Sequence, residues 1–378
     1  MNAPTEDFVL NAAQRAEVIA GLNQILPAHA VLHEVEDTKP YECDGLSLFR
    51  QLPMVVALPD TEEQVIQILK LANRLNAPVV ARGAGTGLSG GAQPHKHGIL
   101  LGMAKFNKIL KVDVQSRSAV VQPGVRNLAI SEAVAQHQLY YAPDPSSQIA
   151  CTIGGNVAEN SGGVHCLKYG LTVHNVLKVR AITIEGEIVE FGSEAPDAPG
   201  LELMNLVIGS EGMLAVVTEV TVKLVPKPAL AQVIMASFDD VANAGNAVAA
   251  VIAAGIIPAG LEMMDKRASQ MVEPFVKAGY DTEAEAILLL ESDGTPEEVA
   301  EEIAEMTRVL NGCGATAIKV SQSEAERLKF WAGRKNAFPA AGRVSPDYYC
   351  MDGTIPRRRL ADVLNAITEM EKKYDMRC

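Results

Sequence analysis

Glycine fills five of the ten positions between residues 82 and 91, and this run limits the possible folds more than any other feature of the chain. The apolar run PVVA at residues 78–81 leads directly into it, which predicts a buried strand followed by a long loop. Glycine permits backbone conformations that other residues avoid, so such a loop can direct its N–H groups toward one centre. The sequence therefore predicts an anion-binding loop that suits a diphosphate, with hydroxyl donors from Thr86 and Ser89.

Two familiar motifs match parts of the same loop. Gly85, Gly87 and Gly90 have the spacing of a dinucleotide-binding fingerprint, and residues 87–91 have the G-x-S-x-G form of a nucleophile elbow. Both motifs need a helix that begins at the loop. The residues that follow, AQPHKHG, do not propagate a helix, so we favour anion binding. A serine hydrolase that uses Ser89 is kept as an alternative.

A second glycine-rich stretch covers residues 143–163 and alternates small residues with Asn, Ser and Thr. We predict a long loop here, because the stretch offers little that could pack as a core. Small side chains let the backbone approach a flat polar ligand closely, so this composition favours ligand binding.

Elsewhere in the first half, helices and strands are mixed. Thr61 and Gln64 form a capping-box pattern at the start of a helix. Residues 176–184 and 187–191 are predicted to be strands that meet at a hairpin turn, Glu185-Gly186.

Pro226 and Pro228 indicate a domain boundary. Beyond it, strands and helices alternate. Helices are predicted over residues 296–310, 324–336 and 356–374, and the last one ends the chain without a strand after it. The predicted strands contain Ile234, Ile257, Ile287 and Ile318.

Composition excludes several classes of function. The formal net charge of -13 argues against nucleic acid or an anionic membrane as a partner, and the basic run at residues 357–359 is interpreted as a solvated helix face. The uncharged residues 241–261 are too rich in Ala, Gly and Asn for a membrane span, so we predict a buried helix that leads into a strand.

The cysteines and the N-terminus point to one compartment. Six cysteines are scattered without C-x-x-C spacing, which argues for a reducing compartment without disulfides or zinc. The acidic N-terminus lacks the pattern of a signal peptide. We expect a cytoplasmic protein.

Histidines give weaker signals. His95 and His97 form an H-x-H pair, but two ligands without a third make a poor metal site, so no metal is predicted. His165 follows the second glycine-rich stretch and is a candidate neighbour of an active site.

Four segments occur in the order found in FAD-linked oxidases of the vanillyl-alcohol oxidase/PCMH superfamily: residues 82–91, 122–124, 153–163 and 209–212, the last before a VVTEV strand. The chain most resembles the family of the FAD-binding subunit of glycolate oxidase and FAD-linked D-lactate dehydrogenases. The resemblance covers nearly the whole chain. It implies an α+β fold: a PCMH-type FAD-binding domain of two α/β subdomains with an N-terminal helix over residues 1–228, and a cap domain over residues 229–378.

The resemblance implies which residues hold FAD. The flavin is expected to be non-covalent, because Leu88-Ser89 occupies the region where covalent members often carry a histidine. The implied cofactor-binding residues are Arg82, Gly83, Ala84, Gly85, Thr86, Gly87, Leu88, Ser89, Pro123, Gly124, Pro143, Asp144, Pro145, Gly154, Gly155, Asn156, Asn160, Gly163, Tyr169, Glu211, Gly212 and Val217.

The cap domain is expected to be an antiparallel sheet with helices on one side. By resemblance, Arg334 in the run FWAGRK holds the substrate carboxylate with a bidentate fork. Residues 348–356 resemble the strand that brings polar groups toward the flavin. Some relatives have a lysine where Cys350 falls in this sequence.

The implied reaction is FAD-dependent oxidation of a small 2-hydroxy acid, glycolate or D-lactate, to the 2-oxo acid, with the C2 hydrogen facing flavin N5. Family members carry later Gly-Asp-Gly-Asn-x-His and Glu-His-Gly segments that supply a divalent-metal site and a general base. Neither occurs in this sequence. We therefore expect a C-terminally truncated chain with an incomplete cap, which alone need not be active.

The resemblance also implies partners. Electrons are expected to pass to a partner or acceptor, with flavin and iron–sulfur subunits that could hold the protein at the inner membrane. A flavin-binding subunit without turnover of its own is the second alternative.

Overall fold

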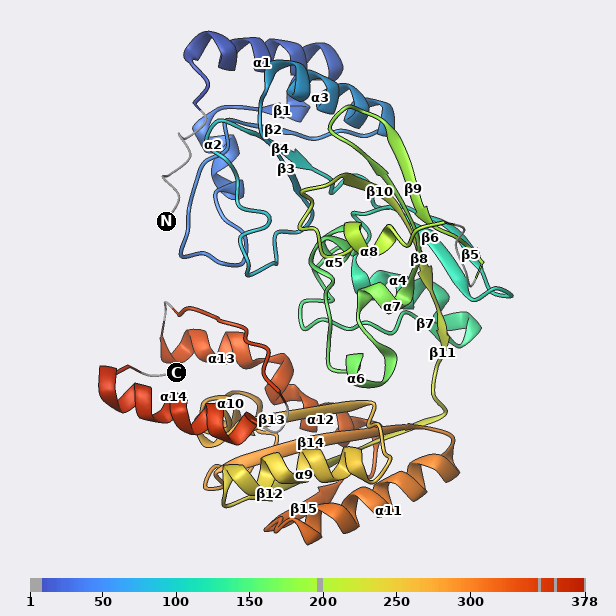
Figure 1. Ribbon diagram of the computed structural model, residues 1–378, viewed down its shortest axis with the longest axis vertical. Helices are drawn as coiled ribbons and strands as arrows, with labels where there is room; N and C mark the ends of the chain where they lie inside the picture. Colours follow the sequence, from blue (N-terminus) through green and yellow to red (C-terminus); the bar gives the residue numbers. More distant parts are fainter. Residues whose placement is uncertain (1–8, 196–199, 346–347, 357–358, 377–378) are drawn as a thin grey trace. The chain divides into compact units, whose positions relative to one another are not determined.

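The computed structural model describes residues 9–195, 200–345, 348–356 and 359–376 (Figure 1). The chain divides into two compact units. The first comprises Met1–Gly163 and Gly170–Lys227, and the second comprises Val164–Tyr169 and Pro228–Cys378. The segment Val164–Tyr169, which follows the second glycine-rich stretch, thus belongs to the second unit, a division that the sequence did not indicate.

The first sheet of unit one has the order β1-β2-β4-β3, with parallel pairing of β4 to β2 and β3. Its strands are β1 (Val31–Leu32), β2 (Val55–Ala57), β3 (Val79–Arg82) and β4 (Ile99–Gly102). The helices α1 (Ala12–Ile25) and α3 (Glu62–Leu75) lie side by side and bury apolar side chains with those of the sheet (Figure 1).

The second sheet of unit one is antiparallel, with the order β5-β6-β10-β8-β9. Its strands are β5 (Ile109–Asp113), β6 (Ser118–Val121), β8 (Val176–Ile182), β9 (Ile188–Gly192) and β10 (Val216–Lys223). Its core includes residues of α4 (Asn127–Val134), α5 (Ile153–Glu159), α7 (Thr172–Asn175) and α8 (Met204–Val207). The shorter elements are η1 (Ala28–Ala30), α2 (Val35–Thr38), η2 (Lys39–Tyr41), η3 (Ala135–His137), β7 (Leu139–Tyr140), α6 (Cys166–Tyr169) and β11 (Val225–Pro226).

Unit two is built on an antiparallel sheet with the order β13-β14-β12-β15. Its strands are β12 (Leu230–Phe238), β13 (Gly260–Asp265), β14 (Ala286–Gly294) and β15 (Ala317–Val320). The helices are α9 (Val241–Ala253), α10 (Lys266–Val276), α11 (Pro296–Gly312), α12 (Glu324–Lys335), α13 (Ala337–Val344) and α14 (Leu360–Tyr374).

Helices cover both faces of this sheet, so the expectation of helices on one side is wrong (Figure 1). On β14, Leu288 and Leu290 pack with residues of α9 and α11, while Ile287 and Leu289 pack with residues of α10 and α12. Alternate residues of a strand point to opposite faces. The unbroken apolar run AILLL therefore already signalled a strand buried on both sides.

Several local predictions are confirmed. Thr61 caps α3, with the side chains of Thr61 and Gln64 bonded to each other's backbone N–H. Gly186 lies in the turn between β8 and β9 with a positive φ of 77°. The uncharged segment near residue 250 is the partly buried helix α9 followed by β13. No helix in the described part of the chain is long and apolar enough to cross a membrane.

Other predictions are wrong. Residues 153–159 form α5 rather than loop, since Ile153 and Val157, one turn apart, are buried and anchor the helix. Ile257 precedes β13 and is 55% exposed. Residues 348–356 contain no strand. Arg357 and Arg358 of the basic run lie outside the described residues.

The predicted capping box of α3 can be tested by substitution of Thr61. We expect Thr61→Ala to lower the free energy of unfolding by about 1 kcal/mol, because one helix N–H loses its acceptor. Thr61→Ser, which keeps the hydroxyl, should cost much less. Urea denaturation of both variants measures this, and equal losses would contradict it.

Candidate functional site

The glycine-rich loop leaves β3 at Arg82 as the sequence predicts. Gly85 and Gly90 have positive φ values of 68° and 83°, which favour glycine. No helix occurs between residues 83 and 98, so neither the dinucleotide fingerprint nor the nucleophile elbow has its required context. Ser89 is exposed on this loop.

Because glycine has no Cβ, this loop can approach the start of α5 closely. A Cβ at Gly83 would lie 2.2 Å from Thr152 Oγ1, and a Cβ at Gly85 would lie 2.2 Å from Arg82 Nη2. Neither distance is sterically allowed. At Gly83 the Thr152 hydroxyl leaves no room for a Cβ, while at Gly85 the positive φ of 68° favours glycine, since the Arg82 head group could move aside.

The other predicted cofactor segments of unit one meet around α5. Gly154 N–H donates to Pro123 O at 2.8 Å, and a Cβ at Gly163 would lie 2.4 Å from Asp144 O. Glu211 N–H donates to Ala158 O at 2.8 Å. Gly124, Pro143, Pro145, Gly155 and Gly212 lie in or beside these same segments. Val217 lies in β10 and packs against the core of the second sheet.

Two buried asparagines hold the segments together. Asn156 Nδ2 donates to Asn127 Oδ1 at 2.9 Å, and Asn127 Nδ2 donates to Pro143 O at 2.9 Å. Asn160 ends α5 in the left-handed conformation and accepts a hydrogen bond from Val173 N–H at 3.0 Å. Asn127 was missed in the sequence, because its partners lie 16 and 29 positions away.

Charged groups surround the glycine loop. Burial lowers the pKa of Arg82, which faces the Tyr41 ring at 5.8 Å. Burial, followed by the charges of Glu211 and Asp44, raises the pKa of Glu159. The Glu159 carboxylate reaches the loop, since its Oε1 would lie 2.8 Å from a Cβ at Gly91.

Two buried polar atoms at this place have no hydrogen-bond partner in the described structure: Thr152 Oγ1 and Asp44 Oδ2. Buried polar atoms normally have partners. Unpaired acceptors and donors beside a glycine-lined backbone fit a polar ligand that supplies hydroxyls and a diphosphate. The residues present therefore fit the cofactor that the resemblance implies.

The second unit holds Arg334, near the end of α12. Arg334 Nε donates to Glu262 Oε2 of β13 at 3.0 Å. The Arg334 side chain is 36% exposed and that of Glu262 is 23% exposed. The two terminal nitrogens of Arg334 make no hydrogen bond to the described residues, so they can bind a carboxylate.

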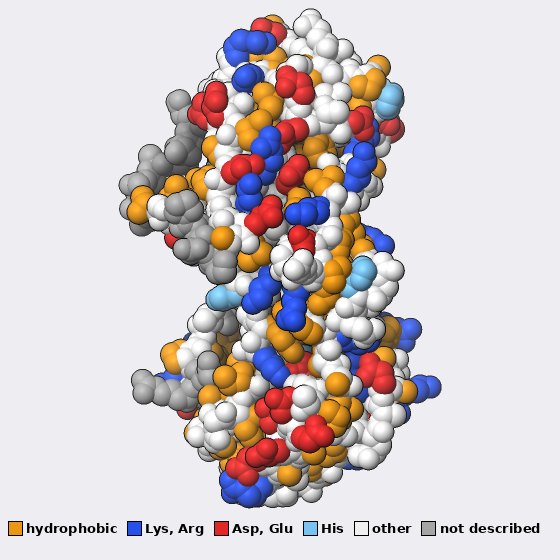
Figure 2. Space-filling view, turned by 90° about the vertical axis from the view of Figure 1, so that its right-hand side faces the viewer, with side chains coloured by type: hydrophobic (Ala, Val, Ile, Leu, Met, Phe, Trp, Pro, Cys, Tyr) orange, Lys and Arg blue, Asp and Glu red, His pale blue; other side chains and the backbone are white. Residues whose placement is uncertain are grey.

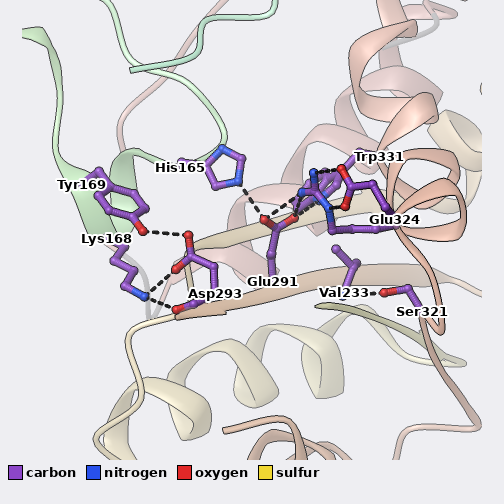
Figure 3. A network of polar contacts seen from close by, with 10 residues as sticks. His165, Lys168, Tyr169, Val233, Glu291, Asp293, Ser321, Glu324 and Trp331 are labelled. Carbon is purple, nitrogen blue, oxygen red and sulfur yellow. Dashed lines mark hydrogen bonds and ion pairs between the residues drawn. The ribbon is translucent and has the colours of Figure 1, made fainter. Parts of the chain in front are cut away.

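Buried carboxylates of β14 bind the short piece of chain, residues 164–169, that joins unit two (Figure 3). His165 Nε2 lies 3.1 Å from Glu291 Oε1. Lys168 Nζ and the Tyr169 hydroxyl donate to the two carboxylate oxygens of Asp293 at 2.5 and 2.7 Å. Tyr169 thus belongs to unit two, with its hydroxyl on Asp293.

Glu291 also binds α12 (Figure 3). It accepts hydrogen bonds from Arg327 Nη1 at 2.9 Å and from Trp331 Nε1. Burial opposes ionisation of Glu291, but the hydrogen bond and charge of His165 and the charge of Arg327 outweigh it, so its pKa lies below the ordinary value.

No group of three metal-ligating side chains occurs among the described residues. His95 and His97 face each other with ring centroids 6.0 Å apart. On the face seen in Figure 2, Lys and Arg side chains are interspersed with Asp and Glu.

Comparisons with known proteins show which families this chain matches. Residues 53–192 match the family described as "FAD binding domain", and residues 227–378 match "FAD linked oxidases, C-terminal domain". Glycolate oxidase subunit GlcD of Escherichia coli (strain K12) is 58% identical over 98% of this chain and 74% of its own length. D-lactate dehydrogenase of Anaerostipes hadrus is 30% identical over 96% of this chain and 78% of its own length.

A solved structure shows the same fold. The crystal structure of p-cresol methylhydroxylase with substrate bound superposes with a TM-score of 0.73 at 17% identity, over 85% of this chain and 70% of that chain. The predicted PCMH-type fold with a following oxidase domain is confirmed. The comparisons do not support the expected C-terminal truncation.

The fold, the glycine-lined segments and both family matches lead to one conclusion. The chain belongs to the family of FAD-linked oxidases that includes glycolate oxidase subunit GlcD.

Proposed function

We propose that this oxidoreductase converts a small 2-hydroxy acid, glycolate or D-lactate, to the 2-oxo acid. The observation that carries the proposal is the 58% identity to a glycolate oxidase subunit along 98% of this chain. The relatives named D-lactate dehydrogenase support the same substrate class. FAD supplies the acceptor for the electrons and hydrogen removed from C2.

In this proposal, the first unit holds FAD. The loop from Arg82 to Ser89 would direct backbone N–H groups at the diphosphate. The segments around α5, with Thr152 Oγ1 unpaired among them, would line the rest of the cofactor. Leu88 and Ser89 stand where a covalent tether would need a histidine, so we propose non-covalent binding.

In the second unit, Arg334 would bind the substrate carboxylate. Its two terminal nitrogens form a fork that matches the two oxygens of a carboxylate. Substrate binding would then place a second negative group on an arginine whose Nε already binds Glu262.

Partners and location are also proposals. The word "subunit" in the name of the E. coli relative supports an assembly, and flavin and iron–sulfur subunits that receive electrons would complete it. We propose a cytoplasmic location, with contact to the inner membrane through such partners.

Anaerobic spectroscopy tests the reaction. Addition of glycolate or D-lactate to the FAD-loaded chain should bleach the flavin absorbance band, because electrons pass from C2 to FAD. Bound FAD that neither acid bleaches would favour the alternative of a flavin-binding subunit without turnover. Ester hydrolysis that Ser89→Ala abolishes while FAD stays bound would favour the serine hydrolase.

Arg334→Lys tests carboxylate binding. We expect the KM for glycolate or D-lactate to rise about tenfold or more, because lysine cannot form the two parallel hydrogen bonds. Steady-state kinetics measures this, with the exposed Arg308→Lys on α11 as the matched control. An unchanged KM would remove Arg334 from the site.

Gly83→Ala tests the close approach of the loop to α5. The new methyl would lie 2.2 Å from Thr152 Oγ1, so the loop or the Thr152 side chain must shift, and FAD content should fall strongly. Gly312→Ala, where a Cβ meets nothing within 4 Å, should keep FAD. Full FAD content in Gly83→Ala would contradict the claim that FAD binding needs the close approach of this loop to α5.

Glu159 gives a pH test. Its raised pKa should rise further when the diphosphate adds negative charge, so FAD binding takes up a proton. FAD affinity should therefore fall as the pH rises through the pKa of Glu159. Glu159→Gln should bind FAD more tightly and with a flatter pH profile. Fluorescence titration measures both, and weaker binding by Glu159→Gln would contradict this account.

A further inference from the structure

A buried tyrosine holds the backbone of α12 one residue before Arg334. Tyr280 lies between α10 and β14 and is 6% exposed. Its hydroxyl donates to Phe330 O at 2.5 Å and accepts from Gly333 N–H at 2.9 Å. One oxygen thus bridges two backbone groups near the C-terminal end of the helix.

Glycine at position 333 admits this tyrosine. A Cβ there would lie 2.4 Å from Tyr280 Cε2 and 2.5 Å from the hydroxyl oxygen. Gly333 has no positive φ, so the contact with the ring, and not the backbone conformation, requires the absence of a side chain. Burial raises the pKa of Tyr280 to about 12.

The rest of α12 is fixed on the same side of the sheet. Trp331 donates to Glu291 of β14 (Figure 3). Arg327 donates to the same carboxylate. Trp331 is 1% exposed and Glu291 is 1% exposed. The helix therefore cannot rotate or slide without breaking buried polar contacts, which are costly to leave unpaired.

Glu262 fixes the other end of the Arg334 side chain. Because its Oε2 accepts from Arg334 Nε, the edge of the guanidinium that carries Nε is occupied. The pair of terminal nitrogens is the remaining edge with two parallel donors. A carboxylate would bind end-on to that pair.

We propose that Tyr280 and Glu262 are positioning residues for Arg334: Tyr280 fixes the helix backbone at Gly333, and Glu262 turns the guanidinium so that its terminal nitrogens receive the substrate carboxylate. This inference rests on the proposed function. Both residues act through Arg334, and neither contacts the reacting atoms.

Tyr280→Phe tests whether Tyr280 positions Arg334, because it deletes only the bridging oxygen. We expect the KM for the 2-hydroxy acid to rise about three- to tenfold, the effect of one hydrogen bond, with kcat changed less than about twofold. The dissociation constant of oxalate, a carboxylate that is not a 2-hydroxy acid, should rise by the same factor in titrations followed by the flavin spectrum.

The control is Val251→Ala on α9, which is buried on the opposite face of the sheet. It should lower Tm without a change in KM or in oxalate binding. A Tyr280→Phe variant that lowers Tm but binds oxalate as the wild type does would overturn the role of Tyr280 and leave it purely structural.

Glu262→Ala and Glu262→Gln test whether Glu262 positions the guanidinium of Arg334. Positioning predicts that Glu262→Ala raises the KM and weakens oxalate binding, and that Glu262→Gln, whose amide oxygen still accepts from Nε, restores most of the loss. If Glu262 merely competes with the substrate for Arg334, both variants would tighten oxalate binding, which would overturn the proposal.

The role of Arg334 and the roles of Tyr280 and Glu262 can be tested separately. An unchanged KM in Arg334→Lys would end the proposed role of Arg334 itself. A raised KM in Arg334→Lys, together with unchanged oxalate binding in Tyr280→Phe and Glu262→Ala, would end only the positioning role.

Discussion

The close approach of backbone at Gly83 to the start of α5 is the constraint on which the first unit depends. It brings the loop after β3 against Thr152, a contact that any larger residue would prevent. Glycine also permits a close backbone approach at Gly154 to Pro123 and at Gly163 to Asp144. Segments far apart in sequence thereby present backbone and small polar side chains to one place, as a long polar cofactor requires.

In the second unit, two buried carboxylates and their partners have the corresponding role. Glu291 and Asp293 follow the apolar run of β14 and are nearly fully buried. A buried carboxylate is costly unless it is paired and hydrogen-bonded. Partners from residues 164–169 and from α12 meet that need (Figure 3). The network thus favours one arrangement of α12 on the sheet, and α12 carries Arg334.

The sequence was most informative where the signal is local. The capping box at Thr61, the turn at Gly186 and the glycine run at residues 82–91 each specify their own conformation. The fold class followed from four ordered segments. By contrast, the glycines and asparagine of α5 favour a loop, although the spacing of Ile153 and Val157 specifies a helix.

Long-range contacts were beyond local reasoning. Nothing in the residues near 165 indicated that His165, Lys168 and Tyr169 would bind β14, more than 120 positions away. The roles of Tyr280 and Gly333 are likewise visible only once α12 is in place. Two-sided burial of β14, however, could have been predicted from its unbroken apolar run.

The central claim is that the glycine-lined segments form one non-covalent FAD site. The most direct measurement is a visible absorption spectrum of the purified chain before and after acid precipitation. Non-covalent binding predicts flavin bands that move to the supernatant, in an amount of about one FAD per chain. A chain that stays colourless after incubation with FAD, or flavin that remains in the precipitate, would contradict it.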